Sequence, residues 1–162
     1  MSASSHVSSS WRRALTIPRP PDFTIWQYET VYLQRWWVIP RNRWFNIYLH
    51  HFLRSDDDRA LHDHPWANCS VLLRGSYREH MPGGIVKLRK PWRPWAFWRL
   101  PMRWPTSAHR VELIGARPVW TLFLTGPKVR VWGFLCPHGW IPWTAFVEKR
   151  PGGNSAGNGC GE

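Results

Sequence analysis

Short hydrophobic runs bounded by turn residues recur along most of the chain. They are rich in β-branched and aromatic side chains, which favours strands over helices. Only residues 25–37 could instead hold a short helix. The predicted strands cover residues 45–53, 70–74, 85–88, 111–114, 119–125 and 129–134.

Glycine and proline mark the breaks between these runs, at Gly75, residues 82–84, Gly115 and residues 126–127. Many short strands joined by such turns are typical of a barrel or a two-sheet jelly roll. We therefore predict an all-β fold with one jelly-roll β-barrel over residues 23–149. The Ser-rich residues 1–22, which resemble an organelle transit peptide in composition, and the Gly-rich residues 150–162 are expected to be disordered tails.

The formal net charge is +12, from 22 Lys and Arg against 10 Asp and Glu. Residues 85–110 contain seven basic residues and no acidic one, whereas residues 56–58 are three aspartates that we expect to form a solvated loop. A positive field attracts nucleic acid, acidic membranes, or a small carboxylate or phosphate. Charge alone does not choose among these partners.

No apolar run reaches the roughly 18 residues that are needed to span a membrane. The three cysteines, Cys69, Cys136 and Cys160, have unrelated spacings. This pattern argues against a disulfide framework and favours a reducing, cytoplasmic location.

The most informative stretch is Leu-His-Asp-His-Pro-Trp over residues 61–66. Alternate residues of a strand share a face, so His62 and His64 point the same way while Asp63 points away. The same alternation places Asn68 on the histidine face and Cys69 on the other.

A third imidazole is available at His109, just before a predicted strand and 45 residues after His64. Three histidines leave coordination positions of a transition metal open, as a catalytic site requires. We predict one metal held by His62, His64 and His109. The alternative is that the first pair are two polar residues on an exposed strand.

The pattern HxHxxxNxxxxxxG from His62 to Gly75 resembles the first cupin motif, with Asn68 where that motif has Glu. The position of His109 before a strand is similar to the second cupin motif. The resemblance implies a cupin, RmlC-like barrel with a bound metal. Small uncharacterised cupins of bacteria and phages look similar.

Residues 45–80 and 109–127 also resemble thiol dioxygenases of the cysteine dioxygenase type, through Phe45-Asn46, the His62 to His64 pair, Cys69 and residues 109–112. This resemblance implies iron held by three histidines, and it places Arg35 near that family's carboxylate-binding arginine. The family's Ser-His-Tyr relay is missing, because Thr121, Phe123 and Thr125 occupy the matching strand.

Four further residues have predicted roles. Arg35 and Asn68 are candidates for substrate binding, since a guanidinium clamps a carboxylate and an amide adds no negative charge. Tyr77 and Glu79 share a face beyond Gly75 and are candidates for supporting the metal ligands or moving protons. A surface ion pair for Arg35 and ordinary strand positions for Tyr77 and Glu79 are the alternatives.

The predicted function is a mononuclear non-haem iron oxygenase acting on a small anionic molecule, with Fe(II) favoured and Zn, Ni or Mn as alternatives. A non-catalytic cupin that binds metal and ligand is the second hypothesis. A basic nucleic-acid-binding protein is the third, to which the Trp- and Arg-rich residues 91–105 would contribute; we interpret them as a loop covering a barrel end. A homodimer is also open.

Overall fold

The computed structural model describes residues 19–56, 60–93 and 100–161. In these residues strands account for most of the regular structure, and the helical elements described are one short α-helix and two 3-10 turns. The strands are β1 (Phe23–Gln27), β2 (Thr30–Trp37), β3 (Asn46–Phe52), β4 (Leu61–His62), β5 (Asn68–Arg74), β6 (Tyr77–Met81), β7 (Ile85–Arg89), β8 (Met102–Arg103), β9 (Arg110–Leu113), β10 (Val119–Thr125), β11 (Gly133–Cys136), β12 (Gly139–Pro142), β13 (Val147–Arg150) and β14 (Gly153–Ala156); the helical elements are η1 (Pro82–Gly84), η3 (Ile114–Ala116) and α1 (Trp143–Phe146).

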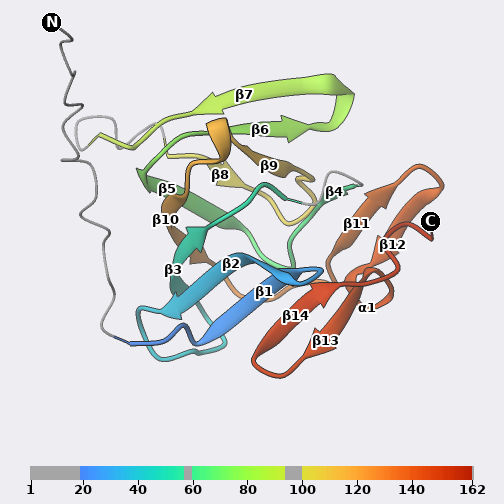
Figure 1. The fold of residues 1–162 in the computed structure, drawn as a ribbon, viewed down its shortest axis with the longest axis horizontal. Coiled ribbons are helices and arrows are strands. Elements are labelled where there is room, and N and C mark those ends of the chain that lie inside the picture. Colours follow the sequence, from blue (N-terminus) through green and yellow to red (C-terminus); the bar gives the residue numbers. More distant parts are fainter. Residues whose placement is uncertain (1–18, 57–59, 94–99, 162) are drawn as a thin grey trace, which may run out of the picture.

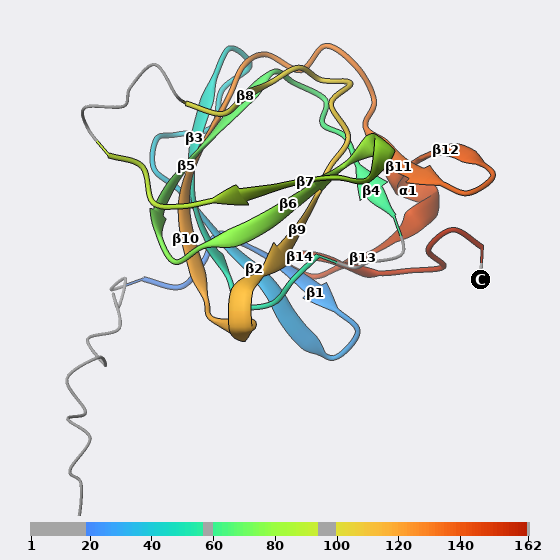
Figure 2. The same ribbon diagram turned by 90° about the horizontal axis from the view of Figure 1, so that it is seen from above.

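Three sheets form the barrel. The largest has eight strands in the order β13-β14-β1-β2-β3-β10-β5-β8, and two three-stranded sheets have the orders β12-β11-β4 and β7-β6-β9. Seen from above, the strands are arranged around a common centre (Figure 2). The fold is therefore an all-β jelly roll of the cupin type, which confirms the predicted class.

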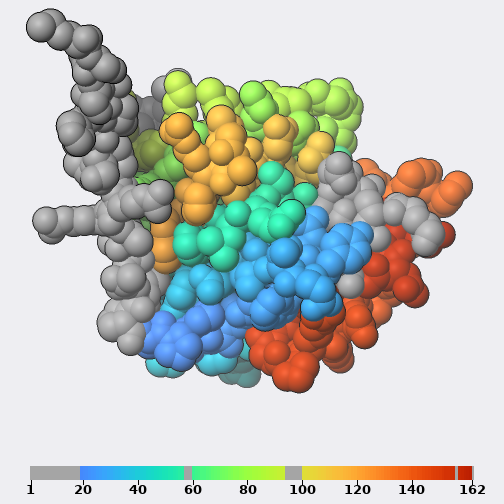
Figure 3. Space-filling model, viewed as in Figure 1, coloured from blue at the N-terminus to red at the C-terminus, as the bar shows by residue number. Residues whose placement is uncertain are grey.

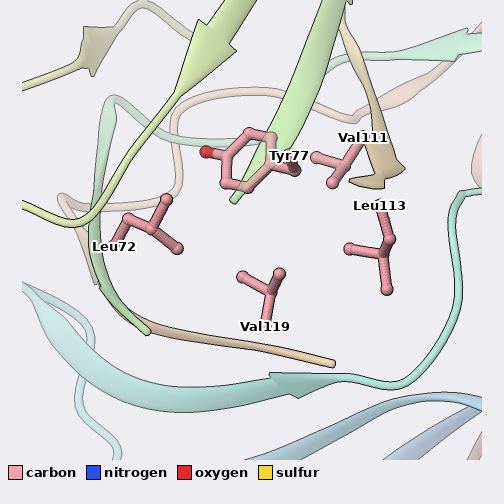
Figure 4. Close-up of a cluster of buried hydrophobic side chains, with 5 residues drawn as sticks. All are labelled: Leu72, Tyr77, Val111, Leu113 and Val119. Carbon is pink, nitrogen blue, oxygen red and sulfur yellow. The ribbon is translucent and has the colours of Figure 1, made fainter. Parts of the chain in front are cut away.

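A compact apolar cluster fills one end of the barrel. Its side chains come from four strands and converge on one point (Figure 4). Each is at most 5% exposed, and burial of a side chain of this size contributes about 1.5–3 kcal/mol. The members are Leu72, Tyr77, Val111, Leu113 and Val119.

Strand β10 lies at the centre of the large sheet, between β3 and β5. Its pairing with β3 runs without a break, with Thr121 opposite His50 and Phe123 opposite Tyr48. Because alternate residues share a face, this register sends these four side chains toward the barrel interior. The barrel interior beside the apolar cluster is thus lined by polar and aromatic groups.

Two predicted elements are corrected. Residues 25–37 form parts of the β1–β2 hairpin instead of a helix, with Tyr28 at φ 54° in the connection. The strand expected over residues 129–134 starts only at Gly133. In both places hydrophobic periodicity alone did not reveal where pairing begins.

The C-terminal residues also differ from expectation. Within the tail expected to be disordered, β14 pairs with β13 and lies parallel to β1, and the red C-terminal strands pack directly against the blue β1 (Figure 3). Cys136 and Cys160 form a disulfide, so the argument against disulfides from the cysteine spacings is wrong, and Cys69 is a buried free cysteine.

Parts of three predictions fall on residues that are not described. These are most of the N-terminal tail, two of the aspartates in residues 56–58, and residues 94–99 of the Trp-rich loop. No helix in the described part of the chain is long and apolar enough to cross a membrane.

Candidate metal centre

The three predicted histidines come together at one end of the barrel. His62 and His109 face each other across a reciprocal backbone pair, in which each N–H donates to the other's carbonyl at 2.9 Å. His64 lies two residues further along, and its N–H donates to Pro105 at 3.2 Å. The ring centroids form a near-equilateral triangle with sides of 4.9, 5.2 and 5.2 Å.

Asp63 shows why the two histidines share a face. Its side chain points away from them and accepts hydrogen bonds from the Gly133 N–H at 2.8 Å and from the Trp140 indole at 2.9 Å, and it also pairs with Arg130. These contacts tie the chain around β4 to β11. Strand alternation then leaves only His62 and His64 for the interior.

Glu79 fixes the orientation of His109. The carboxylate is completely buried and accepts hydrogen bonds from His109 Nδ1 at 2.8 Å and from Arg103 and Arg89 at 2.6 Å each. A carboxylate can only accept, so the proton of His109 sits on Nδ1 and the Nε2 lone pair faces His64, whose Nε2 is 3.0 Å away.

The charge of Glu79 is stable in this setting. Burial alone would raise its pKa, but the hydrogen bond from His109 and the positive charges of Arg103 and Arg89 outweigh burial and hold the pKa far below its usual range. Glu79 therefore remains a carboxylate at neutral pH. The sequence predicted that Glu79 supports the metal ligands. It lies behind His109 and is not part of the cavity wall.

All three imidazoles are neutral at physiological pH. Burial lowers the pKa of His62 and His64 well below 6.5, and the neighbouring imidazoles and Arg103 lower both further. Burial also lowers the pKa of His109, against the opposing effect of Glu79. Neutral imidazole is the form that binds metals. The potential ligand atoms lie within 4.8 Å of one another, close enough to share one ion.

Asp56 is a group that sequence reasoning missed. It is buried instead of solvated, accepts a hydrogen bond from the Val111 N–H and another from the Tyr32 hydroxyl, and lies 3.8 Å from His62 Nδ1. A run of aspartates carries no signal that distinguishes one inward-facing member from its neighbours. Asp56 thus adds a carboxylate beside the imidazole ring of His62.

A cavity of about 420 Å³ opens from the histidines into the barrel. Its wall includes Arg35 and His50, the inward-facing member of the His50–His51 pair. Arg35 Nε donates to His50 Nε2 at 2.8 Å, and the guanidinium lies over the rings of Tyr48 and Phe23 at 5.0 and 5.7 Å. Burial lowers the pKa of Arg35 to about 10, so it is still cationic.

The remaining predicted residues lie at different distances from the cavity. Tyr77 borders it from the apolar cluster, and burial raises the pKa of its phenol. Asn68 is buried on the interior face but is not part of the wall, and no partner for its amide is found among the described residues. Cys69 is likewise outside the wall.

β10 is the strand that matches the position of the missing Ser-His-Tyr relay, and its residues Thr121 and Phe123 point into the barrel. Thr121 is fully buried, and the Phe123 ring stacks on His50 at 5.0 Å and lies 5.6 Å from the His64 ring. Of the relay positions on β10, the one beside the histidine rings is therefore occupied by the phenyl ring of Phe123. It can exclude water, but it has no proton to give.

No protein family model and no curated protein sequence matches the chain. Three solved structures illustrate what it is similar to. A conserved protein with a double-stranded β-helix domain from Klebsiella pneumoniae has a TM-score of 0.48 and 17% identity over 63% of this chain and 83% of its own. A DMSP lyase from Ruegeria pomeroyi has a TM-score of 0.49 and 13% identity over 66% of this chain, which spans only 52% of the lyase. A cupin-like protein from Thermotoga maritima has a TM-score of 0.48 and 12% identity over 69% of this chain and 80% of its own.

Fold and site together define the class of protein. The chain is a cupin-type jelly roll with a cluster of three neutral histidines, one buried and two half-buried, facing an internal cavity. Such a cluster is able to hold a transition metal.

Proposed function

We propose that the protein is a metal-binding cupin that acts as a mononuclear non-haem Fe(II) oxygenase on a small anionic molecule. The observation that carries this proposal is the triangle of neutral imidazoles in the wall of an internal cavity. Fe(II) is favoured by the sequence resemblance, while Zn, Ni and Mn accept similar donors.

The residues fit such a metal. His62, His64 and His109 would hold it, and bound Fe(II) would supply redox chemistry toward dioxygen at a positive centre. Glu79 keeps the proton of His109 on Nδ1 and thereby the lone pair on Nε2. Metal-ligating histidines commonly donate their second N–H in this way.

The cavity wall performs the remaining tasks. Arg35 provides a fixed cation for an anionic ligand. The ring of Phe123, between His50 and His64, keeps water from the histidines. We assign Tyr77 and Glu79 positioning roles: the Tyr77 side chain is hydrogen-bonded to Arg103 and Ser70, and Glu79 lies behind His109.

The site also argues against plain cysteine dioxygenation. Thr121, Phe123 and Thr125 offer neither an imidazole nor a phenol as a proton donor. This lack favours one alternative, a non-catalytic cupin that uses the same metal and cavity to bind a ligand. The nucleic-acid hypothesis has less support, since Arg78 and Arg89 are paired with Glu112 and Glu79.

The test combines metal analysis with oxygen uptake. Purified protein should contain one transition metal per chain, and His109→Ala should lose most of it, whereas His138→Ala, at an exposed turn position, should not. Saturable oxygen uptake by the Fe(II) form with a small acid would support the oxygenase. Binding of an acid without any uptake would favour the non-catalytic cupin, and full metal content in His109→Ala would exclude the three-histidine site.

A further inference from the structure

The charged side chains of the cavity wall differ in whether the described residues provide a partner for their charge. Arg103 is neutralised by Glu79, and the Asp56 carboxylate accepts hydrogen bonds from Val111 and Tyr32. Arg35 differs, because no carboxylate of the described residues lies within ion-pair distance of it. Its guanidinium is therefore a half-buried cation in the cavity wall with no acidic partner in the described part of the chain. Such a group is costly to bury unless a ligand anion joins it.

Arg35 is also held in one position. Its Nε donates to His50, and aromatic rings lie against its guanidinium on two sides. His50 is itself stacked on Phe123 at 5.0 Å. The terminal nitrogens of Arg35 have no hydrogen-bond partner among the described residues. A fixed guanidinium with two unused terminal nitrogens suits the two oxygens of one carboxylate.

The wall beside the histidines is apolar and aromatic. The Trp132 ring lies 6.4 Å from the His62 ring, 5.4 Å from Phe134 and parallel to Trp143 at 5.9 Å. Phe134 in turn stacks on Phe146 at 3.6 Å. Flat rings packed in this way offer area for an apolar or aromatic ligand, and few hydrogen bonds for a polar one.

We infer that the cavity binds a monocarboxylic acid with an aromatic or bulky apolar body, whose carboxylate pairs with Arg35 and whose body packs on the wall formed by Trp132, Phe134 and Trp143. This inference rests on the proposed function in that it names the ligand class of the same site. The volume of about 420 Å³ is in the range for a small drug-sized molecule.

The same wall disfavours free amino acids. An α-ammonium group needs an acceptor, and Asp56 is the one acid among the described residues of the wall, already engaged by Val111 and Tyr32. In the metal-free chain, the described wall offers a second carboxylate only one further cation without an acidic partner, Arg41, which is exposed and lies over Trp37 at 5.3 Å. Exposed charge pairs add little affinity. Zwitterions and small dicarboxylates should therefore bind more weakly than an apolar monoacid.

The test measures binding by calorimetry to the metal-free full chain, which cannot turn over and has no metal to bind the carboxylate of a probe. The probes are 3-phenylpropanoate, its neutral amide, phenylalanine and succinate. The acid should bind at least tenfold more tightly than each of the other three. Arg35→Gln should weaken binding of the acid about 10- to 100-fold and that of the amide less than twofold, because only the acid uses the charge. Arg43→Gln, an exposed cation outside the cavity, is the matched control.

The aromatic wall is tested separately. Trp132→Ala should weaken the acid and the amide alike by about tenfold, whereas Trp104→Ala, at 74% exposed and outside the cavity, should change neither. Equal binding of acid and amide by the unaltered protein, or tighter binding of phenylalanine or succinate, would overturn the inference even if the variants did not fold. Because this binding assay contains no metal, failure of the oxygenase proposal would appear only in the uptake assay.

Discussion

His109 and Glu79 are joined by a hydrogen bond of 2.8 Å between the imidazole Nδ1 and the buried carboxylate. This one contact determines which nitrogen of His109 faces the other two histidines. It also connects the histidine cluster to Arg89 and Arg103, so that the orientation of a candidate metal ligand depends on charged residues of β6, β7 and β8.

Replacing Glu79 by Gln should weaken metal binding about 10- to 100-fold, as loss of such supporting contacts does elsewhere. The amide oxygen can still accept from His109, but it no longer neutralises Arg89 and Arg103, so unfolding free energy should fall by about 3 kcal/mol. Competition with a chelator and urea unfolding measure the two effects. Glu112→Gln, which removes the charge pairs with Arg78 and His80 on the same sheet and touches none of the three histidines, should leave metal affinity unchanged.

Replacing Asp56 by Asn should lower metal affinity severalfold with a smaller loss of stability. The Asn side-chain oxygen can keep the bond from the Val111 N–H, but the negative charge 3.8 Å from His62 Nδ1 disappears. The same chelator competition measures the effect. Tyr32→Phe, which removes only the hydroxyl donor to Asp56, should have a smaller effect, and an unchanged affinity in Asp56→Asn would show that this carboxylate does not support His62.

The metal-free protein should lose stability as the pH falls from 7 to 5.5. The buried His50, His62 and His64 have folded-state pKa values well below 6.5, so only the unfolded chain takes up protons in this interval. Stability is therefore present above pH 6.5 and is lost as pH falls below it, with a slope of up to about 1.4 kcal/mol per pH unit for each imidazole. Urea unfolding at several pH values measures the slope.

The variant His64→Phe tests whether these imidazoles cause the pH dependence of stability. Removing one buried imidazole should reduce the slope by up to about 1.4 kcal/mol per pH unit, whatever the change in overall stability. A stability that does not vary between pH 7 and 5.5 in the unaltered metal-free protein would mean that the three imidazoles are solvated.

The sequence predicted those features that are determined by residues within one short segment. β10 has the predicted bounds because its hydrophobic run and its flanking turns lie within one segment. The approach of His62 to His64 follows from two-residue alternation alone. The position of His109 before a predicted strand made it a candidate, but its pairing with His62 joins segments far apart in sequence and could not be seen from local alternation.

Non-local features were beyond reach for the same reason. Nothing near residues 153–156 indicates that they pair with β1, which lies at the other end of the chain. The inward turn of Asp56 depends on a backbone N–H of β9, 55 residues away. From the sequence, a polar or glycine-rich segment is interpreted as a loop. Whether it forms a strand depends on a partner strand elsewhere in the chain that supplies its hydrogen bonds.

The disulfide between Cys136 and Cys160 gives the last prediction. It joins β11 to the C-terminal residues and lies in a small apolar cluster with Phe146 and Ala60. Cross-linking cysteines 24 residues apart restricts the unfolded chain and contributes about 3 kcal/mol. Cys160→Ser should lower the unfolding free energy by about that amount while metal content stays at the level of the unaltered protein, because neither cysteine borders the cavity. Cys69→Ser is the matched control, since Cys69 is the free thiol, and it should leave the disulfide intact. Thiol labelling under denaturing, non-reducing conditions should find one reactive cysteine in the unaltered protein, two in Cys160→Ser and none in Cys69→Ser. Three reactive cysteines in the unaltered protein would mean that the bond does not form, and the stability of Cys160→Ser should then change little.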